Sequence, residues 1–340
     1  MGKLICFGEI MGRLNPEGYL RIVQAPRFEI SYAGGEANVA VSLSNYGLDA
    51  AYVTKLPQND IGMAAKMELQ KYGVDTSRIV YGGDRLGLYF VEKGASQRGS
   101  KVIYDRKYSS IAMAERGDFN WDTILANADW FYFTGITPAL GGNVAEICLD
   151  ACKKARELGV TIGCDLNYRK NLWSREKAGA VMAGLMEYVD LCIANEEDAA
   201  DVFGIKAAAT NILSGQLNRE GYVDVARQLV ERFGFKTVGI TLRSSISAND
   251  NDWAAMLYQN GEAYFSKNYH IHIVDRVGGG DSFAGALIYA IQNKYQAQEA
   301  VEYAAAASCL KHSVEHDFNM VTVDEVRKLM EGDASGRVQR

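Results

Sequence analysis

Proline and cysteine are scarce in this sequence: its 340 residues include 4 Pro and 6 Cys. No stretch rich in Pro, Gly or Ser divides the chain into two halves, and no internal repeat is present. A chain of this length can bury roughly three quarters of its unfolded surface, so a stable core does not require disulfides. The composition, 48% apolar and 23% charged, is that of a globular protein and excludes disordered, collagenous and mucin-like classes.

Positive charge is not in excess either. The chain has 36 Lys and Arg against 42 Asp and Glu, so its formal net charge is −6. Proteins that bind nucleic acid or anionic membranes need a basic surface, and we therefore expect neither partner. No run of roughly 18 apolar residues predicts a membrane span, and the apolar run Leu4–Phe7 is too short for a secretory signal. We expect a cytoplasmic protein whose partners are small molecules.

The six cysteines lie mostly within apolar runs. Cys148 and Cys152 are four residues apart on a predicted helix, a spacing that leaves a metal pair open. No second cysteine pair and no histidine lies near them in the sequence, so we favour buried, reduced thiols, as in a cytoplasmic protein.

Short apolar runs alternate with amphipathic segments along most of the chain. This alternation predicts an α/β fold with a central, mostly parallel sheet flanked by helices. The predicted core strands are Leu4–Phe7, Ala51–Thr54, Trp130–Thr134, Val160–Asp165, Leu191–Ala194 and Thr237–Leu242. The predicted helices include Gly35–Tyr46, Gly62–Tyr72, Val144–Leu158, Val223–Phe233 and Ser282–Gln292.

Two regions depart from this alternation, residues 10–32 and 85–108. In them apolar and polar residues alternate with period two between Gly, Pro and charged turns; Phe28, Ile30 and Tyr32 are examples. The two insertions predict a small β-sheet that stands over the main domain as a lid. We expect one domain over residues 1–330 and a frayed polar tail at 331–340.

The segment Asp275–Phe283 reads Asp-Arg-Val-Gly-Gly-Gly-Asp-Ser-Phe and leads into the last of these helices. Its three glycines, 278 to 280, let the backbone turn tightly and let bare amides approach a ligand. The helix start adds unpaired N–H groups and the positive end of the helix dipole, which favour an anion. Asp281 would lie beside that anion, or alternatively serve as a helix N-cap. An anion site with an adjacent base suits phosphoryl transfer.

A second glycine cluster, Ala33-Gly34-Gly35-Glu36-Ala37-Asn38, opens the first long helix. Taken alone, it is equally explained as a turn from the lid into that helix. Together the two segments resemble the paired signatures of the ribokinase-like (phosphofructokinase-B, PfkB) carbohydrate kinases, and the resemblance covers essentially residues 1–330. In that family the second signature is D-x-x-G-A-G-D, and here Gly279 replaces the usual Ala. A P-loop of the form G-x-x-x-x-G-K-[ST] is absent, so ATP must be bound in another way.

The resemblance implies a kinase that uses ATP and Mg²⁺. Asp281 would be the general base that removes a proton from the sugar hydroxyl. The amides of Gly278, Gly279, Gly280 and Asp281 would stabilise the transferred phosphoryl group.

The family organises Mg²⁺ through water with an Asn-x-x-Glu motif. The matching residues here are Asn195, Glu197 and Asp198, with Asp198 in place of the family's Glu, so the metal role falls to Glu197 or Asp198. A solvated helix N-terminus is the alternative explanation of this acidic run. A monovalent cation such as K⁺ is a further cofactor that the resemblance allows, although His316 replaces the Gly that often precedes the position of Asp317 and puts a cation role of that loop in doubt.

Seven residues are candidates for contacts with the nucleotide: Asn195, Gly278 and Gly280 from the motifs above, and Thr241, Arg243, Ser308 and His312. Thr241 lies in the predicted strand Thr237–Leu242, and Arg243 follows it where the family often carries Lys-x-Gly near the nucleotide. Ser308 and His312 belong to the C-terminal helices, near which the family binds adenine. His312 is also explained as an ordinary helix-end histidine.

The lid indicates the substrate. Period-two alternation predicts that Tyr104 and Arg106 point into the same cleft as Tyr89 on the neighbouring strand. A guanidinium beside tyrosine hydroxyls suits a carboxylate, although an isolated arginine on a lid edge is also explained as simply exposed. Asn167 and Arg169 share a face at the carboxyl end of a core strand, where ligands gather in open α/β sheets.

These elements, with Lys311–Ser313 and Asp317–Asn319, resemble the 2-keto-3-deoxygluconate kinases within the family. The resemblance implies transfer of phosphate from ATP to the terminal C6 hydroxyl of that sugar acid, with Gly34, Gly35 and Asn38 among the sugar contacts. Fructokinases share the Asp-x-Asn-x-Arg element, so a fructokinase or another sugar kinase stays open, as does a non-catalytic sugar-acid sensor. Family members often pair through their lids, which allows a homodimer.

Overall fold

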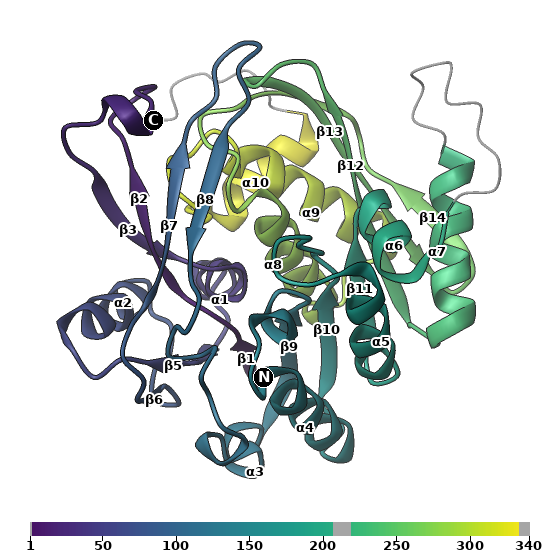
Figure 1. The fold of residues 1–340 in the computed structure, drawn as a ribbon. Coiled ribbons are helices and arrows are strands. Elements are labelled where there is room, and N and C mark those ends of the chain that lie inside the picture. The colour runs from purple at the N-terminus through teal and green to yellow at the C-terminus, as the bar shows by residue number, and fades with distance from the viewer. Residues whose placement is uncertain (1, 207–218, 333–340) are drawn as a thin grey trace.

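The computed structural model describes residues 2–206 and 219–332, and within them a nine-stranded sheet runs through the centre of the molecule (Figure 1). The order of the strands is β14-β13-β12-β11-β10-β9-β1-β4, and β15 pairs with β13. The strands from β12 to β4 are parallel, whereas β13, β14 and β15 form an antiparallel edge. Their bounds are β1 Lys3–Phe7, β4 Ala50–Val53, β9 Ala128–Thr134, β10 Thr161–Asp165, β11 Leu191–Ala194, β12 Thr237–Ser245, β13 Asp250–Gln259, β14 Glu262–Phe265 and β15 Tyr269–His272.

Helices cover both faces of this sheet, because its strands carry apolar side chains on both sides. In β1, Leu4 and Cys6 belong to one core cluster, and Ile5 and Phe7 belong to the other. The first cluster includes residues of α1 Gly35–Asn45, α2 Asp60–Lys71, α8 Gly279–Gln292, α9 Ala297–Lys311 and α10 Val323–Glu331. The second includes residues of α3 Trp121–Ile124, α4 Val144–Glu157, α5 Arg175–Met186, α6 Glu196–Phe203 and α7 Arg219–Phe233. The predicted α/β fold is confirmed.

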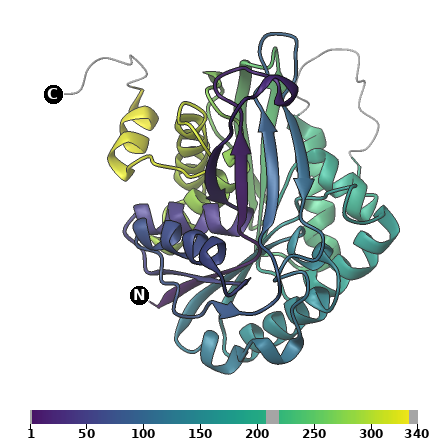
Figure 2. The same cartoon turned by 60° about the vertical axis from the view of Figure 1, so that its left-hand side comes forward.

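The two predicted insertions form one separate sheet of four strands, which is the lid (Figure 2). Its order is β3-β2-β7-β8, with β2 and β7 parallel and the outer pairs antiparallel. The bounds are β2 Met11–Asn15, β3 Glu29–Ala33, β7 Gly87–Glu92 and β8 Lys101–Asp105. The short strands β5 Lys55–Leu56 and β6 Val80–Tyr81 make a further pair, and short 3₁₀ helices lie at Ile22–Gln24, Arg116–Asp118 and Thr137–Leu140.

The structure differs from the sequence prediction in two informative places. Helix α8 begins at Gly279 rather than Ser282, because Gly278 caps it in the left-handed conformation, with φ 82°. Helix α9 was expected only as one of the C-terminal helices, without bounds. The helix is buried along most of its length and carries many small residues, Ala304–Ala307 among them. It therefore lacks the one-sided apolar stripe by which a surface helix is recognised in a sequence.

The structure also shows the state of the cysteine side chains. All six cysteines are free, and five of them are buried. Burial raises the pKa of the Cys148 and Cys152 thiols on the buried face of α4, which agrees with inert, reduced groups. Of the predicted tail, residues 333–340 lie outside the described residues. In the part of the chain that the structure describes, no helix combines the length and the apolar character that a membrane crossing needs.

Candidate active site

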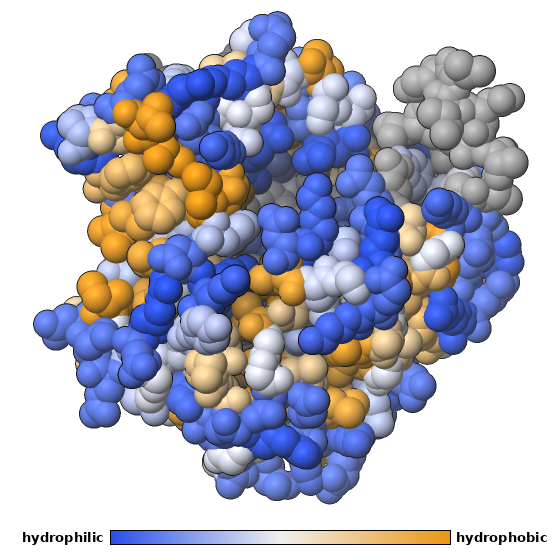
Figure 3. Space-filling model, viewed as in Figure 1, coloured by the Kyte–Doolittle hydropathy of each residue, from blue (hydrophilic) through white to orange (hydrophobic). Residues whose placement is uncertain are grey.

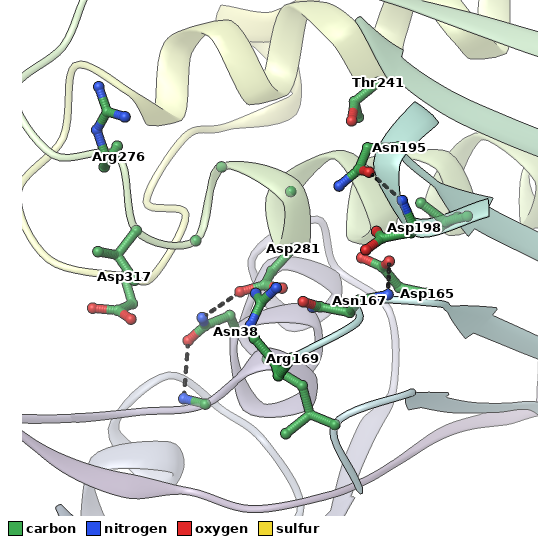
Figure 4. Close-up of a pocket in the computed structure, with 18 of the residues that line it drawn as sticks. Asn38, Asp165, Asn167, Arg169, Asn195, Asp198, Thr241, Arg276, Asp281 and Asp317 are labelled. Atoms are coloured by element: carbon green, nitrogen blue, oxygen red, sulfur yellow. Dashed lines mark hydrogen bonds between the residues drawn. The ribbon is translucent and has the colours of Figure 1, made fainter. Parts of the chain in front are cut away.

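A cavity of about 750 Å³ lies between the lid and the carboxyl ends of the parallel strands (Figure 4). Ligands of open α/β sheets bind at this edge. Seventeen of the residues predicted for the site line the cavity: Gly34, Gly35, Asn38, Tyr89, Tyr104, Arg106, Asn167, Arg169, Asn195, Glu197, Asp198, Thr241, Arg243, Gly278, Gly279, Gly280 and Asp281.

The glycine turn before α8 forms one wall of the cavity. Gly278 needs to be glycine for two reasons: its φ is positive, and a Cβ there would overlap the carbonyl oxygen of Asp317. A Cβ at Gly280 would meet open space. The first N–H groups of α8 have no partner within the helix and lie at the positive end of its dipole. The turn therefore offers an anion site in the cavity wall.

Asp281 lies in the first turn of α8, beside this anion site. Its Oδ2 accepts a hydrogen bond from Asn38 Nδ2 at 2.6 Å, and the Oδ1 of Asn38 accepts one from the Gly34 amide at 3.4 Å (Figure 4). Residues 243 positions apart in the sequence thus meet at one carboxyl group. Removal from solvent raises the pKa of Asp281 to about 7, against the opposing effects of Asn38 and Arg169. A carboxyl group with such a pKa can accept a proton near neutral pH.

A second acidic group lies where β10 and β11 end. Asp165 Oδ1 accepts a hydrogen bond from the Asn167 amide at 3.1 Å, and Asp198 Oδ1 accepts one from the Tyr168 amide at 3.0 Å. Asn195 caps α6, its Oδ1 accepting from the Asp198 amide at 2.8 Å. Burial raises the pKa of Asp198 to about 6. Burial, and then repulsion by Asp198, raises the pKa of Asp165 well above its ordinary value.

Two further arginines, Arg243 and Arg276, line the cavity. Arg276 Nη2 donates to the carbonyl oxygen of Ala248 at 2.8 Å, while its buried Nε has no partner among the described residues. Burial and the neighbouring charge of Arg243 lower the pKa of Arg276. Like charges held together in this way are stabilised by an anion placed between them.

The lid contributes Tyr89, Tyr104 and Arg106, which share the cavity as predicted. The structure corrects one expectation, that Arg106 is free for a ligand. Its Nε donates to Glu9 Oε2 at 2.7 Å, and its Nη2 contacts the same oxygen. Glu9 is buried, and its other oxygen, Oε1, accepts a hydrogen bond from Ser109 Oγ, so both of its oxygens have partners. A guanidinium has five N–H groups, and the three that do not face Glu9 remain.

The hydroxyl of Tyr89 has a partner within the protein. It donates to Asp317 Oδ2 at 2.7 Å. The guanidinium of Arg106 lies 5.4 Å from the centre of the Tyr104 ring, within the range of a cation–π contact.

Comparison with known proteins decides the family. The model of the pfkB family carbohydrate kinases matches residues 1–318. The chain belongs to the PfkB family. It is thus an ATP-dependent carbohydrate kinase. It is 33% identical over 334 residues to the 2-dehydro-3-deoxygalactonokinase of Haloferax volcanii, covering 98% of each chain, and 27% identical to the 2-dehydro-3-deoxygluconokinase of Bacillus subtilis, covering 90% and 88%.

Solved structures show the same relationship. The 2-dehydro-3-deoxygluconokinase of Thermotoga maritima is 52% identical and superposes with a TM-score of 0.94, over 97% of this chain and 98% of that one. An Escherichia coli protein with the same fold, 18% identical with a TM-score of 0.81 over 97% of this chain and 99% of that one, was solved in complex with ATP and Mg²⁺.

The residues of this PfkB kinase fit Mg²⁺ only as an ion held mainly by other ligands. Among the described residues no three His, Cys, Asp or Glu side chains gather closely enough to hold a metal ion. Mg²⁺ usually keeps several waters and takes its other oxygens from one or two carboxylates and the substrate phosphates. Glu197 and Asp198, which line the cavity, can supply such carboxylates.

Two predicted nucleotide residues do not line the cavity of the kinase. Ser308 is fully buried and its hydroxyl donates to the Gly279 carbonyl oxygen at 2.7 Å. His312 donates through Nδ1 to the Ser308 carbonyl oxygen at 2.6 Å and packs against Trp253. Both lie behind the glycine turn and support it, because α9 packs against α8 over its length.

Sequence reasoning did not assign a role to several cavity residues, Glu9, Glu36, Arg276 and Asp317 among them. Arg276 lies inside the D-x-x-G signature and could have been singled out there. Asp317 is held by fully buried Arg13, whose Nη1 contacts it while Nη2 donates to Asp275 at 2.6 Å. No local pattern predicts this contact, because it joins residues about 300 positions apart.

Proposed function

We propose that this kinase transfers the γ-phosphoryl group of ATP to the C6 hydroxyl of 2-keto-3-deoxygluconate. The observation that carries the proposal is the carboxyl group of Asp281 beside the glycine turn. A base and an anion site share one cavity wall, and the lid above them presents an arginine. Relatives that are named for this sugar acid, under the name 2-dehydro-3-deoxygluconate, support the substrate.

The proposed chemistry follows from the geometry of the turn. Asp281 accepts the proton of the C6 hydroxyl, whose oxygen forms a bond to the γ-phosphorus while the bond from that phosphorus to the ADP oxygen breaks. The amides of Gly278, Gly279, Gly280 and Asp281 stabilise the negative charge on the transferred group. Asn38 orients Asp281, leaving its other oxygen for the hydroxyl.

The nucleotide would lie along the opposite half of the cavity. Arg243 and Arg276, whose charges lie close enough to interact, would provide positive charge for the phosphates, and Thr241 lines the same cavity. Bound Mg²⁺ would neutralise phosphate charge, with Glu197 or Asp198 as its protein carboxylates. Asn195 fixes the start of α6 and so the position of Asp198.

The carboxylate of the sugar acid is assigned to the lid. Arg106 has three N–H groups left after its contacts with Glu9, and Tyr104 shields it from solvent. Arg169 is a second cavity cation; Asn167 and Arg169 would bind sugar oxygens nearer to Asp281, where Figure 4 shows the guanidinium. Gly34 and Gly35, at the start of α1, let the sugar approach the backbone.

A kinase for the C4 epimer, 2-keto-3-deoxygalactonate, is the second candidate, because the Haloferax relative is named for it. Fructokinase is a third, since a rice fructokinase is 25% identical over 96% of this chain. A non-catalytic sensor would bind sugar acid without turnover.

The deciding experiment measures ADP formation with purified protein, ATP, Mg²⁺ and one sugar at a time. The panel contains 2-keto-3-deoxygluconate, 2-keto-3-deoxygalactonate, fructose, ribose and adenosine. The proposal expects the highest kcat/KM for 2-keto-3-deoxygluconate and phosphate on C6 of the product, read by ³¹P NMR. A higher value for fructose would replace the assignment, and calorimetric binding without ADP formation would indicate the sensor.

We further propose that the lid pairs with the lid of a second copy. Apolar side chains gather over the lid (Figure 3), and all five residues of the edge strand β8 are exposed. Ile30, Val102 and Ile103 are each about 40% exposed or more. Light scattering should find a dimer that Ile103→Glu dissociates. Met67→Glu, on exposed α2 outside the lid, should leave it intact. A monomeric wild type would contradict this.

The reactants and the free thiols also lead us to place the kinase in the cytoplasm.

A further inference from the structure

Lys311, the last residue of α9, is a buried lysine with an unusual environment. Its side chain is inaccessible to solvent. The ammonium group donates to three backbone carbonyl oxygens: that of His316 at 2.6 Å, of Asp275 at 3.2 Å and of Val314 at 3.5 Å. One of these oxygens belongs to the segment that enters the glycine turn, and the other two belong to the segment after α9.

The surroundings of the buried ammonium group compensate for its loss of solvent. Burial lowers the pKa of Lys311, and the nearby carboxylates of Asp275 and Asp317 act in the opposite direction. An ammonium has three N–H groups, and each finds a carbonyl oxygen, so no donor is left without a partner. A buried charge is tolerated only when it is compensated in this way.

A cluster of backbone carbonyl oxygens around one positive charge is also how proteins hold K⁺. Here the position is already filled by a group of the chain itself. His316, which adopts a left-handed conformation with φ 63°, turns its carbonyl oxygen toward the ammonium. The residues around this position therefore do not fit an added monovalent cation.

We propose that the Lys311 ammonium acts as a tethered monovalent cation, and that the kinase consequently needs neither K⁺ nor Na⁺ for activity. Lys311 is a positioning residue. It joins the carbonyl oxygen of Asp275 to the segment 314–317, and Gly278 packs against the carbonyl oxygen of Asp317. The amides that follow Gly278 are thereby held in place.

The first test uses the wild-type enzyme. Its kcat with ATP and Mg²⁺ is measured in the chloride salts of K⁺, Na⁺ and tetramethylammonium at equal ionic strength. The expected values agree within about twofold. An activation by K⁺ of fivefold or more would overturn the proposal, because it would show that an added cation still completes the site.

The second test removes the tethered cation. Lys311→Ala should lower kcat at least tenfold in tetramethylammonium chloride, and K⁺, NH₄⁺ or methylammonium should restore a large part of it with saturation. A cation role is contradicted if further tetramethylammonium chloride restores kcat equally well, or if no cation restores it. The matched control is Lys55→Ala. In the wild type the ammonium of Lys55 pairs with Asp118 at 2.6 Å outside the cavity, so the kcat of this variant should not depend on the cation.

The third test is independent of turnover and therefore of the proposed substrate. Without ATP or sugar, methylammonium or K⁺ should raise the Tm of Lys311→Ala in a saturable manner and leave the Tm of wild type unchanged. If Lys311→Ala does not fold, Lys311→Ser, which likewise leaves the position of the ammonium empty, is used instead. Kinase activity on another sugar would overturn the proposed substrate and leave the inference about Lys311 standing. Equal Tm shifts in wild type and in the variant would overturn the inference about Lys311 and leave the proposed substrate standing.

Discussion

The imidazole of His312 lies where the Cβ of residue 279 would be. A Cβ built on Gly279 comes within 2.6 Å of both Cε1 and Nε2 of His312. The ring cannot easily move, since its Nδ1 donates to the Ser308 carbonyl oxygen and its face packs against Trp253. The family's usual Ala at this position is thus replaced by Gly in a chain whose α9 brings a histidine against the turn.

We predict that Gly279→Ala destabilises the protein by about 1–3 kcal/mol, the range for overpacking a filled core. Urea unfolding gives the value. Gly184→Ala is the control, because Gly184 lies within α5 and a Cβ there meets open space. That change should stabilise the helix by about 0.5–1 kcal/mol. If both variants shift in the stabilising direction, His312 does not limit the space at residue 279.

Removing the imidazole ring of His312 should make room for an alanine at position 279. In the double variant Gly279→Ala with His312→Ala, we expect a loss of stability smaller than the sum of the two single losses, by about 0.5–3 kcal/mol, because the contact that the first change strains is absent. Additive losses would argue that the two residues act independently. Circular dichroism at increasing urea concentration gives the free energy of unfolding of the wild type, the two single variants and the double variant.

The fold could be predicted well because its signal is local. Six core strands and five helices were predicted within a few residues of their bounds, since buried parallel strands and amphipathic helices each carry a distinct apolar period. The antiparallel edge β13–β15 escaped prediction, and helix α9 was predicted without bounds. Helix α9 is apolar on nearly all sides, so its sequence shows no period.

The site was predictable as far as its residues follow a motif. Asn38 and Asp281 were predicted from two separate signatures, and the structure joins them by a hydrogen bond. The partners of the predicted residues were not predictable. Glu9 holds Arg106 across 97 positions, and Asp317 accepts from Tyr89 across 228. Such contacts are properties of the tertiary structure alone.

Asp281→Asn should lower kcat by roughly 10²–10⁴, the usual effect of losing a general base. The amide of Asn keeps the size of the side chain and can still contact Asn38, so the binding of ATP and sugar should change little. Steady-state kinetics and calorimetric binding separate the two effects. Turnover close to that of wild type would remove Asp281 from the role of base.

The pH dependence of activity should reflect the pKa of Asp281, which burial raises to about 7. The base works only when it is deprotonated. In the free enzyme kcat/KM should therefore fall about tenfold for each pH unit below the inflection near pH 7 and level off above it. An acid limb that begins near pH 4 would show that another, unperturbed carboxyl group is titrating.

The same pKa shift predicts a stability effect of opposite sense to the activity. In the unfolded chain an Asp titrates near pH 4, so between about pH 4 and 7 the folded protein binds more protons than the unfolded chain. Stability contributed by this group therefore falls as pH rises through that window. Asp281→Asn removes the penalty, so its Tm should exceed that of wild type at pH 8, with the difference shrinking toward pH 4. A lower Tm at pH 8 would contradict the shift.

Arg106 gives the sharpest test of the substrate. If its remaining N–H groups hold the carboxylate, Arg106→Ala should raise KM for 2-keto-3-deoxygluconate about 10- to 100-fold, as expected for a lost hydrogen bond to a charged group of about 1.5–3 kcal/mol. KM for a neutral sugar such as fructose should change far less. Arg85→Ala is the control, because Arg85 pairs with Asp105 at 2.9 Å on the lid and does not line the cavity. Equal losses for acid and neutral sugars in Arg106→Ala would mean that the residue serves only to pair with Glu9 and to hold the lid, and the carboxylate assignment would then pass to Arg169.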